Sequence, residues 1–112
     1  MCSNYRPVTR IDRLLTFFGV ERSEETPPSD VFPTGIAPFI RAATSNRPIE
    51  EDRKALVADD GFFGLLPGFA AEVEYGRRTY NARSETVAKL PSFRSPWAKG
   101  QRCIVPVEWF YE

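Results

Sequence analysis

Cys2 is the residue of this chain whose position offers the most distinctive chemistry. Removal of Met1 would leave a free α-amine and a thiol on neighbouring carbons, and such an aminothiol condenses with an aldehyde to close a thiazolidine ring. In unstructured peptides the two groups titrate near ~8 and ~8.5, so both nucleophiles are populated at neutral pH. The alternative is that Cys2 is an ordinary residue of a frayed terminus. Cys2 is therefore a candidate nucleophile, and the state of Met1 is the first observation that bears on it.

The composition indicates one small folded domain without an overall charge. Of the 112 residues, 42% are hydrophobic and 13% are aromatic, which suffices for a modest core and is too much for a disordered chain. Residues 1–76 carry eight basic and twelve acidic side chains, whereas residues 77–112 carry seven basic and three acidic ones. A polyanionic partner should therefore meet the second part of the chain.

The lack of histidine and the pair of cysteines narrow the possible chemistry. The chain has no histidine, which excludes Ser–His and Cys–His catalysis and most zinc sites, so we expect no metal and no cofactor. Two cysteines without a secretory signal indicate a reducing compartment, and we expect a cytoplasmic protein. Cys103 lies in the apolar run 103–105, which predicts a buried, inert thiol. No apolar stretch approaches the length of a membrane span, so no membrane partner is expected.

A short amphipathic helix is expected near the start of the chain. Thr9 suits its N-cap, Asp12 suits its first turn and Gly19 suits its end. Arg10 and Arg13 fall on its solvent side. The apolar positions recur at the spacing of one helix face, which should face the core: Ile11, Leu14, Leu15 and Phe18.

A hairpin should follow the polar, proline-bearing loop 21–33. Residues 36–42 form a short apolar strand, and Pro38 places that strand at a sheet edge or a bulge. Its antiparallel partner is predicted at 54–58, across a polar turn at 44–52 and ended by Asp59-Asp60-Gly61.

The remainder of the chain predicts short helices and further strands. Ser84 or Thr86 could cap a short helix through Leu90, and Ser92 could begin another that ends at the turn Lys99-Gly100. Residues 102–107 and 109–112 are predicted strands. The fold class is therefore α+β, with short, mostly antiparallel strands in an open barrel-like sheet and peripheral helices, in a single domain over 1–112. The strand pattern is still running at Glu112, with no turn, cap or polar tail after Tyr111, as is typical of a truncated domain; whether the native product continues past Glu112 is left open by the sequence.

Four stretches taken together resemble the SRAP (SOS response-associated peptidase) family. Each is a weak signal alone, but their order and spacing match the N-terminal portion of that domain, so the resemblance covers the whole chain and implies that the C-terminal half is lacking. The stretches are Met1-Cys2, Gly64-Leu65-Leu66-Pro67, Tyr80-Asn81-Ala82-Arg83-Ser84-Glu85-Thr86, and Arg102-Cys103-Ile104-Val105-Pro106 running into Phe110-Tyr111-Glu112.

The resemblance implies a DNA damage function with three catalytic residues. Members of the family bind single-stranded DNA and form a covalent thiazolidine with the opened sugar of an abasic site, and a self-processing peptidase activity is also ascribed to them. Cys2 would be the nucleophile, Asn81 would hold the N-terminal cysteine or the opened sugar, and Glu112 would act as general acid and base. These residue types suit the chemistry, because a carboxyl group can move a proton on and off the carbinolamine and an amide both donates and accepts hydrogen bonds. The expected partner is single-stranded DNA that contains an abasic site, bound by a monomer.

The same resemblance suggests residues that bind DNA. Arg83 would contact a phosphate through its guanidinium fork, with Arg94 and Phe69 as further DNA-binding residues. Exposed aromatic side chains such as Phe63, Phe69 and Trp97 could stack on bases, although Phe63 and Trp97 suit a core position better.

The chain departs from the family pattern at two points, which leaves the question of enzymatic activity open. Position 4 is Asn, where family members usually carry an arginine soon after Cys2. The family's catalytic histidine belongs to the second half of the domain, and the chain has none. Two alternatives to a peptidase or lyase-like crosslinking enzyme remain: a catalytically defective fragment that binds single-stranded DNA without covalent chemistry, and an interaction module in which Cys2 has no role.

Overall fold

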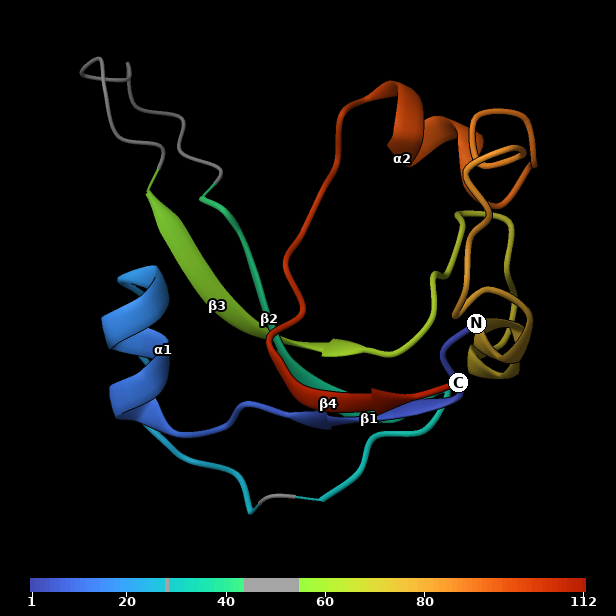
Figure 1. Ribbon diagram of the computed structural model, residues 1–112. Helices are drawn as coiled ribbons and strands as arrows, with labels where there is room; N and C mark the ends of the chain where they lie inside the picture. The colour runs from blue at the N-terminus through green and yellow to red at the C-terminus, as the bar shows by residue number, and fades with distance from the viewer. Residues whose placement is uncertain (28, 44–54) are drawn as a thin grey trace.

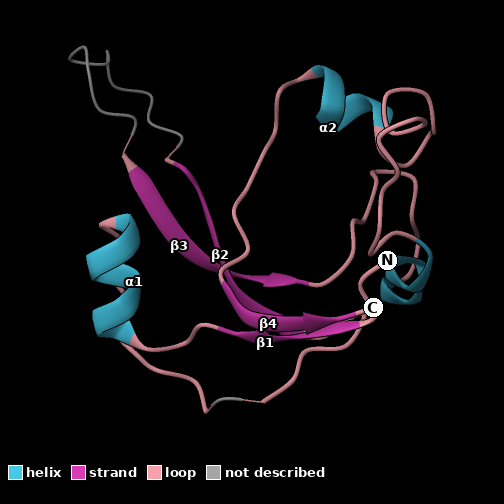
Figure 2. Cartoon of the chain, viewed as in Figure 1, coloured by secondary structure: helices cyan, strands magenta, loops and turns pink. Residues whose placement is uncertain are grey.

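Short antiparallel strands and peripheral helices make up the computed structural model, which describes residues 1–27, 29–43 and 55–112 (Figures 1 and 2). The coarse prediction of a mixed fold with short antiparallel strands is confirmed. The described strands form two separate pairs, β1–β4 and β2–β3, which single bridges at Tyr5–Val31 and Ile40–Ile104 extend. The elements in chain order are β1 (Asn4–Pro7), α1 (Ile11–Phe18), β2 (Ile36–Ala42), β3 (Leu56–Phe62), the 3-10 helix η1 (Val73–Arg78), α2 (Arg94–Ala98) and β4 (Val107–Tyr111).

The predicted hairpin is present as β2 and β3, which pair antiparallel from Ile36–Phe62 to Ala42–Leu56. Pro38 lies at the edge of this pair, as expected. Ile40 donates its N–H to Ile104, on the side of β2 away from β3. Backbone N–H groups two residues apart in a strand point to the same side, so the N–H that Pro38 lacks would also have pointed away from β3. Proline therefore costs the β2–β3 pair no hydrogen bond. The predicted turn at 44–52 and Lys54 fall outside the described residues.

β3 continues through Asp59-Asp60-Gly61, where the sequence predicted its end. Two ion pairs compensate the carboxylates: Arg41 Nε lies 2.7 Å from Asp59, and Arg22 Nη1 lies 3.0 Å from Asp60. The ring of Phe39 occupies the space beside Gly61, where a Cβ atom would come within 2.5 Å of it. Glycine is therefore part of the packing here and does not end the strand.

The first helix, α1, has the predicted bounds but a different N-cap. Arg10 occupies the cap position without a side-chain hydrogen bond, and Glu25 Oε1 accepts the N–H of Ile11 at 2.9 Å from the following loop. Because Arg10 and not Thr9 occupies the cap position, the prediction that Thr9 caps the helix is wrong. Gly19 ends the helix with a φ of 67° and donates its N–H to Leu15, as a glycine C-cap does.

Leu14 is the centre of the core that α1 builds. It is 0% exposed and packs with Val8, Val20 and Ile40. We expect Leu14→Ala to lower the free energy of unfolding by about 2–5 kcal/mol, because it removes buried methyl groups and leaves a cavity. Leu15→Ala is the matched control, since Leu15 is 50% exposed on the same helix, so the prediction that its side chain faces the core is wrong. Urea denaturation of both variants checks this, and equal losses would contradict the assignment of Leu14 to the core.

The predicted elements after residue 80 are present only in part. Residues 84–89 form consecutive turns, Leu90 a bend and 91–93 further turns, and none of them is helical; Pro91 has no N–H with which to continue a helical ladder. The helix predicted from Ser92 begins at Arg94, and Gly100 follows it with a φ of 69°. Of the predicted strand 102–107, only Ile104 pairs before Val107, because Pro106 cannot donate to a ladder.

The pairing of β1 with β4 brings the two ends of the chain together (Figure 1). Asn4 pairs with Tyr111, and Ser3 donates its N–H to Tyr111 O at 2.8 Å. A second core cluster lies under this pair and contains Tyr5, Val31 and Ala37. Cys2 and Phe63 pack against it.

Candidate functional site around Cys2

The side chain of Asn81 forms two hydrogen bonds with the backbone of Cys2. Asn81 Oδ1 accepts the N–H of Cys2 at 3.2 Å, and Asn81 Nδ2 donates to the Cys2 carbonyl at 2.8 Å. One amide thus satisfies both polar groups of a residue 79 positions away in sequence. An amine still carries N–H groups after Met1 is removed, so the first contact can persist at a free N-terminus.

Several contacts fix the segment that carries Asn81. The hydroxyl of Thr79 donates to Leu65 O at 2.7 Å and accepts the Leu65 N–H at 3.0 Å. Phe63 packs edge-on against Tyr80 and against Tyr5 of β1, with ring centroids 5.6 and 5.0 Å apart. These contacts hold the loop after β3, the segment 79–81 and β1 against one another, which places Asn81 beside Cys2.

Gly64 allows that loop to approach η1 closely. Its φ is 142°, and a Cβ atom there would lie 2.8 Å from the carbonyl oxygen of Gly76. A side chain at position 64 would therefore be strained and would also clash with backbone. This gives a structural reason for a glycine at the start of the Gly64-Leu65-Leu66-Pro67 stretch.

Cys2 lies at the edge of an apolar pocket. Its side chain is half-buried, and Sγ lies 3.5 Å from the carbonyl oxygen of Asn4, to which it can donate. The pocket has a volume of about 310 Å³. Its lining is formed by Cys2, Tyr5, Phe63, Val105, Val107 and Phe110.

Glu112 is exposed and follows β4 directly. Because Asn4 pairs with Tyr111 in an antiparallel ladder, the register continues with Glu112 beside Ser3, next to Cys2 in the chain. The β1–β4 pair thus brings the backbone of Glu112 near that of Cys2, although the two residues stand at opposite ends of the sequence. No hydrogen bond to the Glu112 side chain is present among the described residues.

Tyr5 belongs to this site and was not identified from the sequence. It is buried, lines the pocket with Cys2, and burial raises the pKa of its hydroxyl to about 12, with the nearby thiols of Cys2 and Cys103 adding to the shift. The signal that could have marked it as a pocket residue is its place in a short strand next to Cys2. Alternate side chains of such a strand point to the buried face, and Tyr5 is one of these.

The raised pKa of Tyr5 makes stability depend on pH in the alkaline range. The folded state holds the proton more tightly than the unfolded chain, whose tyrosine pKa is near 10.0. Stability is therefore complete below about pH 10 and should fall by about 2 kcal/mol as the pH rises to about 12. Urea denaturation at several pH values checks this, and Tyr5→Phe should remove most of the slope. An unchanged slope in Tyr5→Phe would show that other groups cause it.

The predicted DNA-binding residues lie on the surface. The Arg83 side chain is 76% exposed, with Nε 3.9 Å from the Glu85 carboxylate. Phe69 is exposed and packs edge-on against Tyr75. Arg94 is exposed at the first residue of α2. No hydrogen bond or ion pair joins any of these three residues to Cys2 in the part of the chain that the structure describes.

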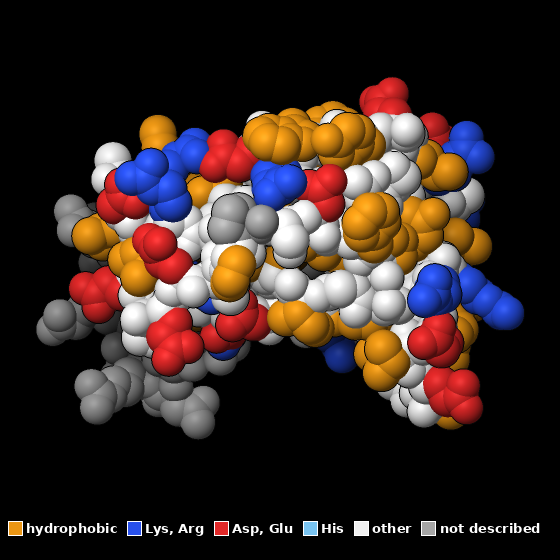
Figure 3. Space-filling model, turned by 90° about the horizontal axis from the view of Figure 1, so that it is seen from below, with side chains coloured by type: hydrophobic (Ala, Val, Ile, Leu, Met, Phe, Trp, Pro, Cys, Tyr) orange, Lys and Arg blue, Asp and Glu red, His pale blue; other side chains and the backbone are white. Residues whose placement is uncertain are grey.

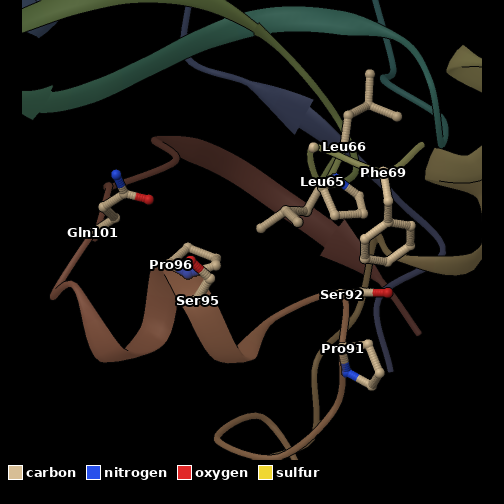
Figure 4. A pocket seen from close by; sticks show the side chains of 10 residues that line it. Leu65, Leu66, Phe69, Pro91, Ser92, Ser95, Pro96 and Gln101 are labelled. Atoms are coloured by element: carbon tan, nitrogen blue, oxygen red, sulfur yellow. The ribbon is translucent and has the colours of Figure 1, made fainter. Parts of the chain in front are cut away.

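Phe69 lines a second cavity, between the loop after β3 and α2. Figure 4 shows Leu65, Leu66 and Phe69 on one side and Ser95 and Pro96 of α2 on another. The cavity has a volume of about 310 Å³. An exposed ring at its rim is a suitable platform for a base.

The other aromatic and thiol predictions have mixed outcomes. Phe63 packs against the core, as expected. Trp97 is half-exposed and lies under the guanidinium of Arg102, with 4.0 Å from Arg102 Cζ to the ring centroid. The prediction that Cys103 is buried is wrong, because the residue is exposed beside the bridge at Ile104. Its thiol nevertheless borders a cavity, and partial burial raises its pKa.

Neither a membrane-spanning helix nor a cluster of metal ligands is found in the described ranges. Among residues 1–27, 29–43 and 55–112, no helix is long and apolar enough to cross a membrane. In the same residues no three side chains of His, Cys, Asp or Glu are grouped as metal ligands.

The stretches that carry the family resemblance meet at this site. There the distant Asn81 holds the half-buried Cys2 next to the β1–β4 strand pair. The chain matches the SRAP family, SOS response associated peptidase, over residues 1–112, and it belongs to that family. It is 31% identical to the abasic site processing protein YobE of Bacillus subtilis over 117 aligned positions, which cover 100% of this chain and 48% of YobE. The abasic site processing protein HMCES of Rattus norvegicus is 38% identical over 53 positions, 45% of this chain and 15% of HMCES.

A solved structure of a longer protein contains the fold of this chain in about half of its length. A crystal structure of a protein from Bordetella bronchiseptica matches with a TM-score of 0.73 and 34% identity, over 99% of this chain and 50% of that one. The chain thus spans about half the length of these two relatives, 48% of YobE and 50% of the Bordetella protein.

Proposed function

We propose that this chain acts on abasic sites in single-stranded DNA and captures their aldehyde covalently through Cys2. The single observation that carries the proposal is the pair of hydrogen bonds between the Asn81 side chain and the Cys2 backbone, which orders a residue that would otherwise fray. Relatives named as abasic site processing proteins support the choice of substrate. An order imposed on the second residue of a chain is difficult to explain if Cys2 has no role.

The proposed chemistry balances without a cofactor. After Met1 is removed, by an aminopeptidase or by the chain itself, the neutral α-amine of Cys2 adds to the sugar aldehyde and gives a carbinolamine. Loss of water gives an imine, and the Cys2 thiolate then adds to the imine carbon while the nitrogen takes a proton, which closes the thiazolidine.

Two side chains are proposed to assist these steps. Asn81 holds the α-amine at the edge of the apolar pocket, so that the aldehyde meets nitrogen and sulfur of one residue. Glu112, next to Ser3 in the extended β1–β4 register, is the proposed general acid and base for the loss of water. The open barrel-like sheet predicted over 1–112 remains a prediction, since the described strands form two separate two-stranded sheets.

Arg83 is proposed to contact a phosphate of the bound strand. Its side chain is exposed and its ion pair with Glu85 is long, so that it can exchange a carboxylate for a phosphate. Arg83→Ala should lower affinity for single-stranded DNA and reduce the slope of log K against log salt by roughly 0.7, the value for one phosphate. Fluorescence anisotropy at several salt concentrations measures this.

Arg77→Ala is the matched control for Arg83→Ala. Arg77 is also mostly exposed, but its Nε lies 2.7 Å from Glu74 on η1, and we expect the salt slope of Arg77→Ala to match that of the unchanged protein. A slope that Arg83→Ala leaves unchanged would make Arg83 an ordinary surface residue.

The direct experiment offers the purified chain two matched oligonucleotides, one with an abasic site and one intact. We expect a heat-stable adduct with the abasic strand alone, seen as a shifted band on a denaturing gel. No adduct under conditions in which the chain binds the strand would contradict covalent capture.

Non-covalent binding of single strands is the second candidate function, and one observation favours it. Asn4 occupies a position where the family resemblance suggests an arginine, and its amide lies 3.5 Å from Asp30 Oδ2. Asp30 also lies 2.8 Å from Arg6 Nε, so the positive charge of Arg6 on β1 is already neutralised. β1 therefore attracts a phosphate near Cys2 only weakly, which disfavours holding an abasic site there. Equal affinity for intact and abasic strands, without any adduct, would favour this candidate.

A further inference from the structure

Tyr5 is a buried tyrosine whose hydroxyl has no hydrogen-bond partner among the described residues. The chain has four tyrosines. The hydroxyls of Tyr75 and Tyr111 form hydrogen bonds with neighbouring side chains, at 2.8 and 3.0 Å, and Tyr80 is partly exposed, so water can reach it. Tyr5 is only 6% exposed. A buried hydroxyl without a partner costs free energy until a water or a ligand bonds to it.

The side chain of Tyr5 forms part of the wall of the pocket that Cys2 borders. Tyr5 belongs to the second core cluster, and Cys2 packs against that cluster. Both residues line the pocket of about 310 Å³, a volume within the range of small-molecule sites. The other lining side chains are those of phenylalanine and valine residues, which have no polar atoms. The Tyr5 hydroxyl is therefore the one oxygen that a lining side chain offers beside the Cys2 thiol.

Backbone and ring contacts hold Tyr5 in place. Its N–H bonds to Val31 O at 3.1 Å, and Val31 returns its own N–H to Tyr5 O at 2.7 Å. The ring packs edge-on against Phe63. This buried position distinguishes Tyr5 from the hydrophobic side chains that form patches among charged ones on the face of the molecule seen in Figure 3. A donor that is already oriented needs no rearrangement when it meets a ligand.

The hydroxyl of Tyr5 keeps its proton at neutral pH. Burial, and after it the nearby thiols of Cys2 and Cys103, raise its pKa to about 12. The group is therefore a hydrogen-bond donor under the conditions in which the Cys2 amine and thiolate react.

We propose that the Tyr5 hydroxyl is a further catalytic group, which donates a hydrogen bond to the aldehyde oxygen of the abasic site while the Cys2 amine adds to the aldehyde carbon. The inference rests on the proposed function and names the group that receives the reacting oxygen. The addition places negative charge on that oxygen, and in an apolar pocket such charge needs a donor. No bond to Tyr5 forms or breaks, since Tyr5 keeps its proton and Glu112 remains the proposed group for proton transfer.

Tyr5→Phe tests the proposal, because it removes the oxygen alone. In single-turnover reactions with an abasic oligonucleotide, the limiting rate of adduct formation should fall by roughly 10- to 150-fold, the value of one hydrogen bond to a charged group. The protein concentration that gives half of the limiting rate should stay the same, because the hydrogen bond forms with the reacting oxygen and not with the DNA strand.

Free propanal is the second probe, since it is an aldehyde without any DNA. Intact-mass measurement follows the gain of propanal minus one water on the chain that lacks Met1. Tyr5→Phe should slow this reaction by a similar factor. A residue that acts only by placing the DNA strand would leave the reaction with propanal unchanged.

Tyr111→Phe is the matched control. Tyr111 lies on β4, is 45% exposed and lines neither the Cys2 pocket nor the larger cavity beside it, so the rates of this variant should stay within about twofold. The free energy of unfolding of Tyr5→Phe at pH 7, measured with urea, should at least equal that of the unchanged chain, because a buried hydroxyl without a partner does not stabilise the fold.

Three results would overturn the inference while the proposed function stands. Equal adduct rates in Tyr5→Phe and the unchanged chain would show that the hydroxyl takes no part. A loss that is seen with DNA but not with propanal would make Tyr5 a DNA-placing residue. A lower free energy of unfolding in Tyr5→Phe at pH 7 would show that the hydroxyl is bonded within the protein. The absence of any adduct in the unchanged chain, with either aldehyde, would instead overturn the proposed function and this inference with it.

Discussion

Replacement of Cys2 by alanine should reduce the yield of heat-stable adduct with abasic single-stranded DNA to background. The alanine amine can still form an imine, but without a thiol the ring cannot close and the imine hydrolyses. Cys2→Ser should behave similarly, since a hydroxyl is a far poorer nucleophile than a thiolate at neutral pH, and we expect a loss of about a hundredfold or more in both variants. Quantified denaturing gels after heating measure the yield.

Cys103→Ser is the matched control for this loss. Cys103 is the second free cysteine and is exposed, but its pKa is raised by partial burial, so it is mainly a thiol at neutral pH. We expect the adduct yield of Cys103→Ser to equal that of the unchanged chain. An equal yield in Cys2→Ala and the unchanged chain would exclude the thiazolidine mechanism.

Replacement of Asn81 by alanine should slow adduct formation by roughly 5- to 150-fold, because two hydrogen bonds of about 0.5–1.5 kcal/mol each no longer orient Cys2. The rate is measured in single-turnover reactions with excess protein. The affinity for intact strands should change little, which separates orientation of Cys2 from DNA binding.

Asn4→Ala is the control for Asn81→Ala. It removes the same amide from β1, where the contact with Asp30 is long at 3.5 Å, and we expect the rate to stay within about twofold, since long contacts are weak. Denaturation of Asn81→Ala shows whether the fold is kept. A rate that Asn81→Ala does not change would mean that Asn81 only satisfies a turn.

The regular elements of the first half follow closely from local sequence signals. The bounds of α1 agree with the apolar spacing and with Gly19, because both act within one helix turn. Its N-cap could not be predicted, since Glu25 reaches Ile11 from another segment. The continuation of β3 through Asp59 and Asp60 likewise depends on arginines from elsewhere in the chain.

The candidate site combines local and distant information in the same way. The resemblance singled out Cys2, Asn81 and Glu112, but two features of the fold position them. The contact of Thr79 with Leu65 helps to place the Asn81 side chain beside Cys2, and the register of β1 with β4 brings the backbone of Glu112 near that of Cys2. Tyr5 could not be assigned to the site before the strand pairing was known. Cys103 was assigned to the core because its neighbours are apolar, yet the residue is exposed, and with Val105 it lines an open cavity.

The mass of the covalent adduct tests the central claim most directly. Intact-mass spectrometry of the chain after reaction with an abasic oligonucleotide should give the mass of the chain without Met1, plus that of the oligonucleotide, minus one water. Digestion should then place the attachment on Cys2. An adduct that retains Met1, or an attachment on a lysine or on Cys103, would contradict the account of Cys2 as the residue that captures the abasic site.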